Sequence, residues 1–502
     1  MRWWMMATML AACAGTGGSD GTDGTDDPGP LPDPWADDLL LGPISDLGDL
    51  RVTGIRWSGW SAEGDVLAVV ELRDGLRPVG QSLVTVGDEV EVLLDSAALQ
   101  AEVGQNGLLD VRTDASGAIS FETAGGCWMW FQDGALDGHC ETDVYVDFRG
   151  PQLAGVQPVL VQQQDRLTYE VGLWDGTWNP YRRSSSRTDA VSEWAVSTDQ
   201  GLWLITADSH DRVDLQRLTP EGELIRRARL QDLPLFAASA QFTARMRGLT
   251  VSPVTGQPYV VLSGRDGPEM TAGTGIHALD DDGLELRVDL TQPIVDGQLL
   301  AFLGTGAEPA LTWAFDRDER IVFTGELADG RTGIYDEDGA GSFTERVRSG
   351  DPVTDRYGEV ISGQTWARIA TGILGPDGEV VFTAKVDGAP EGEDLGAWLA
   401  LPDGSTFELA RLGADLPDST ENVERMLLHG GAVVFPDPTL SDPLLREGAP
   451  VTGEVNEQTL ISWGAAGWNR SIWTEGSCTS VVFVLGGEED EALVRRQAGS
   501  GC

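Results

Sequence analysis

The sequence predicts an all-β fold, and three observations lead to this prediction. Beyond about residue 50, short runs of β-branched and aromatic residues alternate with turns of Gly, Asp and Pro. Sustained helical periodicity is almost absent, and equivalent turns recur at a spacing of mostly 48 to 63 residues. Periods of about 40 to 50 residues with about four strands each are typical of rings of small sheets. We therefore predict a β-propeller of about seven or eight four-stranded blades, with tandem β-sandwiches as the alternative.

Residues 1–12 have the layout of a secretory signal peptide. Arg2 follows the initial methionine as a minimal positive region, and residues 3–12 form a short apolar region that ends in small residues. Further along the chain, no apolar run approaches the roughly 18 residues that a membrane-spanning helix needs. The N-terminus therefore predicts export.

The run Leu10-Ala11-Ala12-Cys13 resembles the lipobox of bacterial lipoproteins. In that family the signal is cut just before the cysteine, whose sulfur is diacylated and whose new amine is usually acylated as well. The resemblance implies that Cys13 is lipidated and becomes the first residue of the mature chain. It also implies a place in the cell envelope, and Ala14, where Asp would favour the inner membrane, points to the outer membrane.

Residues 13–45 are predicted to form a flexible, acidic linker behind the lipid. Ala14 to Pro34 is rich in Gly, Ser, Thr, Asp and Pro, with too little apolar surface to offset the entropy of ordering. The stretch SDGTDGTDDPG within it lacks the acidic spacing and the distal Glu of a calcium-binding loop. The linker is thus expected to act as a tether.

The charge excludes one class of partner. The chain has 81 acidic against 34 basic residues, a formal net charge of -47, and Lys385 as its one lysine. Nucleic-acid binding depends on clustered Lys and Arg that release counterions from phosphates, so we expect no nucleic-acid partner.

Four cysteines remain once Cys13 is set aside, and an even number suits disulfides in an oxidising compartment. They allow three pairings, of which the sequence favours Cys127 with Cys140 and Cys478 with Cys502, because these are nearest along the chain. The first pair would close a hairpin at Gln132-Asp133-Gly134, and the second would hold the C-terminus. The four histidines are scattered and neither cysteine pair has metal-site spacing, so no metal ligands are assigned.

Residues 46–470 are predicted to form the repeat domain, and residues 471–502 a C-terminal strand segment that closes it. In four repeats a turn position is followed after two residues by Ile or Val and after four by Phe: Ile119 and Phe121, Ile321 and Phe323, Val380 and Phe382, Val433 and Phe435. The even spacing places both side chains on one face of a strand, where we expect them to pack between blades. Trp128, Trp130, Trp203, Trp313 and Trp398 are expected to pack in the same way.

These repeats resemble those of bacterial surface proteins described by the pattern N-x-x-G-x-x-A-F. The resemblance is best from about 312 to 417; its Asn position is occupied here by Asp114, Asp316, Gly375 and Leu428, and its Ala position by Ser120, Val322, Val381 and Val434. It implies a propeller-like surface domain and no defined chemistry.

No catalytic motif is found: a Walker loop, a dinucleotide fingerprint, a nucleophile elbow and an H-E-x-x-H helix are all missing. Asp280-Asp281-Asp282-Gly283 and Asp336-Glu337-Asp338-Gly339 are interpreted as hairpin turns, with calcium binding as the alternative. We assign no catalytic, cofactor or metal residues. The prediction is a membrane-anchored binding or scaffolding module for a protein or glycan; the alternative is an exported polysaccharide hydrolase or lyase.

Overall fold

A computed structural model describes residues 38–301, 312–433 and 471–502, with short gaps inside these ranges. The gaps are 43–44, 48, 62, 88, 104–106, 114–118, 124–126, 133, 141–143, 149–156, 164–168, 175–177, 185–189, 197–201, 208–211, 220–222, 241–242, 253, 267–268, 282, 340, 420, 429–431 and 488–489. The chain divides into two units, Met1–Asp37 and Asp38–Cys502, and the described residues belong to the second. Cys13 and nearly all of the predicted linker therefore lie outside the described residues.

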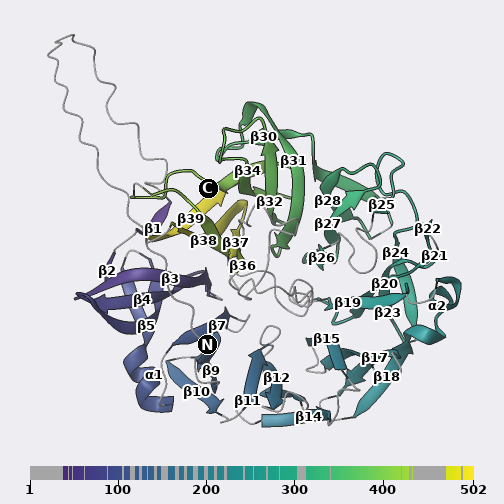
Figure 1. The fold of residues 1–502 in the computed structure, drawn as a ribbon, viewed down its shortest axis with the longest axis horizontal. Coiled ribbons are helices and arrows are strands. Elements are labelled where there is room, and N and C mark those ends of the chain that lie inside the picture. Colours follow the sequence, from purple (N-terminus) through teal and green to yellow (C-terminus); the bar gives the residue numbers. More distant parts are fainter. Residues whose placement is uncertain are drawn as a thin grey trace, which may run out of the picture. The chain divides into compact units, whose positions relative to one another are not determined.

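The described residues of the second unit form eight antiparallel sheets of four or more strands, here called blades 1 to 8, that follow one another around a ring (Figure 1). Blade 1 contains β2 (Asp46–Leu47), β3 (Leu50–Trp60), β4 (Val66–Asp74), β5 (Arg77–Val86) and β6 (Val90–Asp95). Blade 2 contains β7 (Leu108–Thr113), β8 (Ile119–Thr123), β9 (Cys127–Gln132) and β10 (Ala135–Cys140). Blade 3 contains β11 (Val144–Phe148), β12 (Gln157–Gln163), β13 (Tyr169–Trp174) and β14 (Trp178–Ser184). Blade 4 contains β15 (Ala190–Val196), β16 (Leu202–Ala207), β17 (Val213–Leu218) and β18 (Leu224–Arg229).

The second half of the ring has longer connections. Blade 5 contains β19 (Arg245–Val251), β20 (Pro258–Ser263), β23 (Gly275–Leu279) and β24 (Leu284–Asp289). Blade 6 contains β25 (Leu300–Ala301), β26 (Thr312–Phe315), β27 (Ile321–Leu327), β28 (Thr332–Glu337) and β29 (Phe343–Arg348). Blade 7 contains β30 (Pro352–Thr354), β31 (Val360–Leu374), β32 (Val380–Asp387), β33 (Leu395–Ala400) and β34 (Thr406–Arg411). Blade 8 contains β35 (Arg425–Leu428), β36 (Ala432–Val433), β37 (Ile472–Glu475), β38 (Cys478–Gly486), β39 (Glu491–Ala498) and, from the other end of the chain, β1 (Leu39–Leu41).

Short helices and one extra hairpin lie between the strands. They are α1 (Ser96–Val103), the 3₁₀ turn η1 (Leu230–Asp232), α2 (Pro234–Ala238) and the hairpin of β21 (Arg265–Asp266) and β22 (Glu269–Met270). Among the residues that the structure describes, no helix is long and apolar enough to cross a membrane. The all-β propeller prediction is confirmed, and the eight sheets agree with its upper blade count.

Apolar clusters between consecutive blades hold the ring together. The second strands are buried on both faces because each sheet packs against a neighbour on either side; in β38 eight of nine residues are buried. Phe121 lies between blades 1 and 2, Phe323 between blades 5 and 6, and Phe382 between blades 6 and 7. Core packing of the repeated Phe position is thus confirmed in the three repeats where it is described.

The tryptophans follow the same pattern. Trp203, Trp313 and Trp398 are buried in the clusters between blades 4 and 5, 5 and 6, and 6 and 7. Trp130 is half-buried, and the side chain of Trp128 lies outside the described residues. Packing between blades, rather than a platform for stacking sugars, therefore describes the three buried rings.

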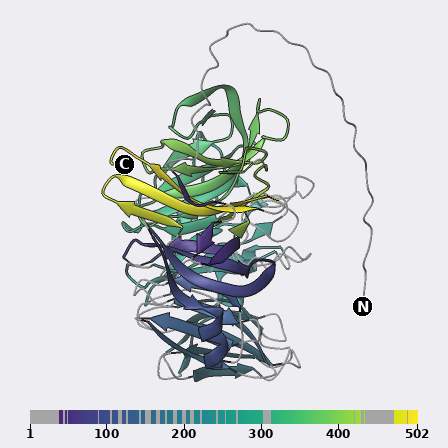
Figure 2. The ribbon, with the colours of Figure 1, turned by 90° about the vertical axis from the view of Figure 1, so that its left-hand side faces the viewer.

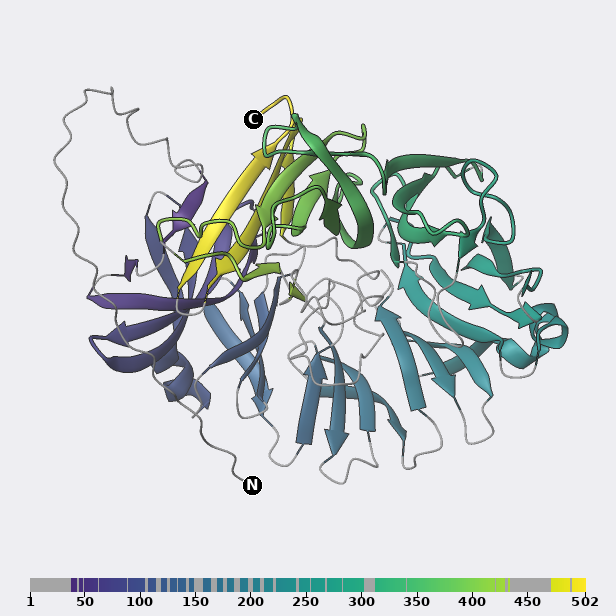
Figure 3. The same ribbon diagram turned by 45° about the horizontal axis from the view of Figure 1, so that its top comes forward.

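The ring closes where the two ends of the unit meet. β1 pairs with β39, so that Leu39 lies opposite Val494 and Leu41 opposite Leu493. The yellow C-terminal strands lie beside the purple N-terminal strands in both Figure 2 and Figure 3. An apolar cluster that includes Leu41, Val70 and Val484 joins blade 8 to blade 1. β1 lies in the range 13–45, which the sequence analysis places in the linker.

Candidate functional site

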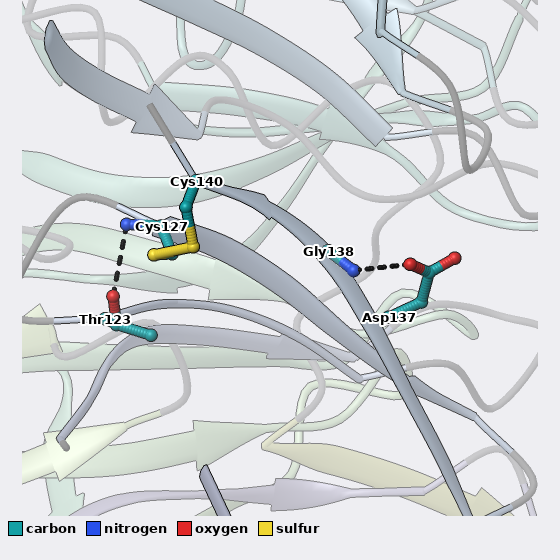
Figure 4. The surroundings of a disulfide bond; sticks show 5 residues. All are labelled: Thr123, Cys127, Asp137, Gly138 and Cys140. Atoms are coloured by element: carbon teal, nitrogen blue, oxygen red, sulfur yellow. Dashed lines mark hydrogen bonds between the residues drawn. A yellow bond between two sulfur atoms is a disulfide. The ribbon is translucent and has the colours of Figure 1, made fainter. Parts of the chain in front are cut away.

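The predicted lipidation residue, Cys13, lies outside the described residues, but both predicted disulfides are present. Cys127 and Cys140 lie directly opposite each other on β9 and β10. Thr123 Oγ1 accepts a hydrogen bond from the amide of Cys127 at 3.1 Å, next to the disulfide (Figure 4). The strands join by a tight turn in which Gln132 opposes Ala135, as the sequence predicts for this hairpin.

The second disulfide fastens the C-terminus to blade 8. Cys478 begins β38 and Cys502 is the last residue, four residues beyond the end of β39. Cys502 itself is exposed. This disulfide therefore joins the start of β38 to the chain just beyond β39.

The turns between the first two long strands of a blade, here called first turns, carry the repeated motif. In blade 6, Oδ1 of the buried Asp316 accepts hydrogen bonds from the amides of Asp318 and Arg320, both at 2.9 Å. Ser61 Oγ makes the equivalent pair of bonds in blade 1, to the amides of Glu63 and Asp65. The position that the surface-protein repeats fill with Asn is thus an acceptor that satisfies the amides of the turn.

In blade 7 the acceptor for the turn amide comes from a different position. Gly375 has no side chain to offer, and Glu379 Oε2 accepts from the amide of Asp377 at 2.9 Å instead. A Cβ at Gly375 would lie 2.6 Å from that oxygen, so the glycine makes room for the carboxylate. The fourth turn residue has positive φ in both blades, 89° at Gly378 and 59° at Glu319, which explains the preference for glycine there.

First turns of consecutive blades also contact one another. Thr255 Oγ1 of blade 5 donates to Glu319 of blade 6 at 2.7 Å, and the amide of Arg317 donates to the carbonyl of Pro376 in blade 7 at 2.9 Å. Glu379 accepts from Thr474 of blade 8, and Trp60 Nε1 of blade 1 donates to the carbonyl of Ser471 at 3.0 Å. The first turns of blades 5, 6, 7 and 1, together with β37 of blade 8, therefore form a continuous belt, here called the turn belt.

Exposed polar side chains cover the turn belt. Arg317 pairs with Asp377 across blades 6 and 7 at 3.1 Å, with exposed side-chain fractions of 55% and 36%. Asp318 is 80% exposed, and Glu63 and Glu475 are exposed as well. Such a surface can form hydrogen bonds and ion pairs with a partner, whereas its buried acids are already committed to the turns.

Beneath the turn belt, blade 6 holds a buried ion pair. Arg346 Nη2 donates to Asp336 Oδ1 at 2.6 Å, and a second guanidinium nitrogen bonds the carbonyl of Gly378 in blade 7. Burial raises the pKa of the Asp336 carboxyl, and the neighbouring Arg346 opposes that shift. Arg346 therefore links two blades as well as two strands.

Asp280 and Asp281 of the first acidic run lie in a turn, whereas in the second run Asp336 and Glu337 end β28 and only Asp338 and Gly339 lie in the turn. Asp280 Oδ1 accepts from the amide of Gly283 at 2.8 Å, and Glu337 Oε1 accepts from the amide of Gly341 at 2.7 Å. Within the described parts of the chain, no group of three or more His, Cys, Asp or Glu side chains is placed to hold a metal ion. The turn interpretation accounts for these oxygens by backbone hydrogen bonds.

Sequence reasoning missed the charged group at ring closure. Asp38, the residue before β1, accepts hydrogen bonds at Oδ2 from two arginines. Arg356 Nη2 of blade 7 donates at 2.7 Å, and Arg496 of β39 donates to the same oxygen. The amide of Arg495 donates to the carbonyl of Asp38 at 2.8 Å. Burial lowers the pKa of Arg496 to about 10. Because 458 residues separate Asp38 from Arg496, no local pattern could have revealed this contact.

A second charged group joins blades 8 and 1. The amide of Ile55 donates to the buried carboxylate of Glu491, which also pairs with Arg425. Arg56 Nε donates to Glu71 Oε1 at 2.8 Å, and this contact lowers the pKa of Glu71. Charged side chains therefore connect blade 8 to blade 7 on one side and to blade 1 on the other.

No family model and no curated protein matches the chain. Among solved structures it is similar to a puromycin-hydrolyzing peptidase of Mycobacterium tuberculosis, with 13% identity, a TM-score of 0.41, and coverage of 78% of this chain and 59% of that one. It is also similar to the WD40 domain of SCAP from fission yeast, with 10% identity, a TM-score of 0.43, and coverage of 93% and 99%. The chain thus spans about three fifths of the peptidase.

Proposed function

We propose that this protein is a lipid-anchored protein of the bacterial cell envelope whose propeller is a non-enzymatic binding or scaffolding module. The Leu10-Ala11-Ala12-Cys13 run carries the anchor part of the proposal, with Cys13 as the acylated residue. Two or more acyl chains hold a protein stably to a bilayer. Two disulfides, each closing within its own blade, suit the oxidising compartment that export implies.

The binding part of the proposal rests on how the charged groups are used. Buried carboxylates such as Asp316 and Asp38 accept backbone or guanidinium hydrogen bonds that hold turns and blades together. The exposed polar side chains of the turn belt are held by a rigid frame of contacts between blades. A rigid, polar surface suits recognition of a protein or glycan, because little entropy is lost on binding. Outer-membrane location is part of the proposal.

Metabolic labelling with palmitate tests the anchor directly. Wild type should incorporate label and fractionate with membranes, whereas Cys13→Ser should incorporate none and leave the membrane fraction. Equal labelling of the two proteins would refute the anchor. For the binding role, cross-linking in cells should recover an envelope partner that Asp318→Arg with Glu475→Arg loses; hydrolysis of a polysaccharide by the purified protein would instead favour the enzyme alternative.

A further inference from the structure

One hairpin of blade 1 ends in a tip of unusual composition for this chain. β4 and β5 join through Gly75 and Leu76, with Asp74 opposite Arg77 and Arg73 opposite Pro78. Leu76 is 96% exposed and Val79 is 46% exposed. A Cβ at Gly75 would meet no atom within 4 Å, so the tip projects into open space. We call residues 73–79 the hairpin tip.

The hairpin tip extends beyond its neighbouring strands. β6 pairs with β5 from Ser82 to Val86, and β3 pairs with β4 as far as Arg73. From Asp74 to Val79 the tip is therefore a two-stranded ribbon, and its residues are exposed. Pro78 on its edge lacks an amide hydrogen, which disfavours pairing with another strand. The side chains of the tip, rather than its backbone edge, are what it can offer to a partner.

Its charge is opposite to that of the chain as a whole. Arg73 and Arg77 are both exposed, and among the described residues neither forms an ion pair. Nearby Arg56, by contrast, is paired with Glu71 at 2.8 Å. Asp74 is the one acid within the tip, so the tip carries a net positive charge in a chain of net charge -47. Glu71, two residues before Arg73, is paired with Arg56 and also attracts Arg73, whereas acids more than about 8 Å away are screened at physiological ionic strength.

We infer that the hairpin tip contacts an anionic bilayer surface, with Leu76 entering the headgroup region and Arg73 and Arg77 binding lipid phosphates. An exposed apolar residue flanked by arginines matches the boundary between acyl chains and anionic headgroups. The contact is weak by itself, but a lipid tether would raise its effective concentration. The 24 residues between Cys13 and Asp38 can span up to about 80 Å when fully extended. The contact would orient the propeller on the membrane.

The test uses the chain from residue 14 onward, which contains every described residue and carries no acyl group. Its binding to vesicles rich in phosphatidylglycerol is measured by co-sedimentation and compared with vesicles of phosphatidylcholine alone. We expect binding to the anionic vesicles that weakens with salt. Leu76→Asp should weaken it at least about tenfold, and Arg73→Gln with Arg77→Gln about fivefold per arginine at low salt.

Val360→Asp is the matched control, because Val360 is another exposed apolar residue, 63% exposed, at the start of β31 in blade 7. This variant should bind as wild type does, and all variants should keep the thermal unfolding midpoint of wild type. Absence of vesicle binding, or equal loss in the control, would overturn the proposal. So would a protein partner lost with Leu76→Asp when no vesicle binding is seen. Because no acyl group is present, this result is independent of the palmitate experiment.

Discussion

At the scale of single residues, the first turns depend on one buried acceptor per turn. Asp316 is 1% exposed and accepts two amides and the guanidinium of Arg320. Asp316→Ala should lower the free energy of unfolding by about 2 to 4 kcal/mol, because two amides lose their buried partner. Asp316→Asn should cost clearly less, since an amide oxygen can accept the same two bonds. Urea denaturation measures both.

Asp318→Ala is the control for this comparison, because Asp318 is 80% exposed and lies 3.9 Å from Arg320. It should change stability by less than about 0.5 kcal/mol. Equal losses for Asp316→Ala and Asp316→Asn would contradict the acceptor role. They would show instead that the charge of Asp316 matters and its hydrogen bonds do not.

His277 gives the propeller a dependence on pH. Burial lowers the pKa of His277 below its ordinary value of 6.5, while the carbonyl of Gly273, 2.8 Å from Nε2, and Asp289 oppose that shift. As the pH falls through 6.5, His277 therefore binds a proton in the unfolded state but stays neutral in the folded state until a lower pH. The contribution of His277 to stability is complete above that pH and is lost as the pH falls below it.

The prediction is a difference between two proteins. His277→Gln does not titrate and can still donate to the carbonyl of Gly273, so its stability should fall less than that of wild type between neutral pH and the acid limb. Thermal unfolding over a pH series measures this. Parallel pH profiles for the two proteins would show that His277 is protonated equally in both states.

At the scale of elements, the Cys478–Cys502 disulfide stabilises the strands that complete blade 8. Closing a loop of 24 residues reduces the entropy of the unfolded chain and contributes about 3 kcal/mol. Cys478→Ser with Cys502→Ser should lower the thermal unfolding midpoint and raise amide exchange in β39 first. The Cys127 and Cys140 pair, changed in the same way, is the control and should loosen β9 and β10 instead. If amide exchange rose equally in all blades in both variants, the idea that each disulfide stabilises its own strands would be contradicted.

The sequence predicts some elements well and others poorly, for physical reasons. The hairpin of β9 and β10 and both disulfides follow from local spacing, because turn residues and nearby cysteines act over short separations. The repeat at 428–435 is predicted to be equivalent to the other three. In the structure, however, its strands β35 and β36 form an edge of blade 8. The first turn of that blade lies at Gly476, where φ is 63°. A long interruption within one blade leaves no periodic signal.

At the scale of the whole molecule, closure explains what local patterns could not give. Asp38, Arg356 and Arg496 meet because the ring brings blade 7, β39 and the start of the unit together. Each of these residues has ordinary neighbours in the sequence, and Asp38 lies in the range expected to be linker. Apolar periodicity predicted the blades, but the contacts that join the ends depend on the completed fold.

Closure also connects the structure to the proposed anchor. The segment that would carry the lipid leads directly into β1, the outer strand of blade 8. Closure of the ring depends on the pairing of β1 with β39 in the register that places Leu39 opposite Val494. These two residues adjoin the hydrogen-bonded Asp38 and Arg495, so they form a non-hydrogen-bonded pair, for which the Cα atoms lie about 4.5 Å apart.

Engineered cross-linking tests the pairing of β1 with β39. In the chain from residue 14 onward, Leu39→Cys with Val494→Cys should form a disulfide within one molecule under oxidising conditions, because its geometry fits a cross-strand pair. Leu39→Cys with Gln497→Cys, displaced by three residues or about 10 Å along the strand, should not. Mass spectrometry of the non-reduced digest measures both. We expect the first cross-link alone; a missing cross-link, or one formed mainly between molecules, would contradict a ring closed by its own N-terminal strand.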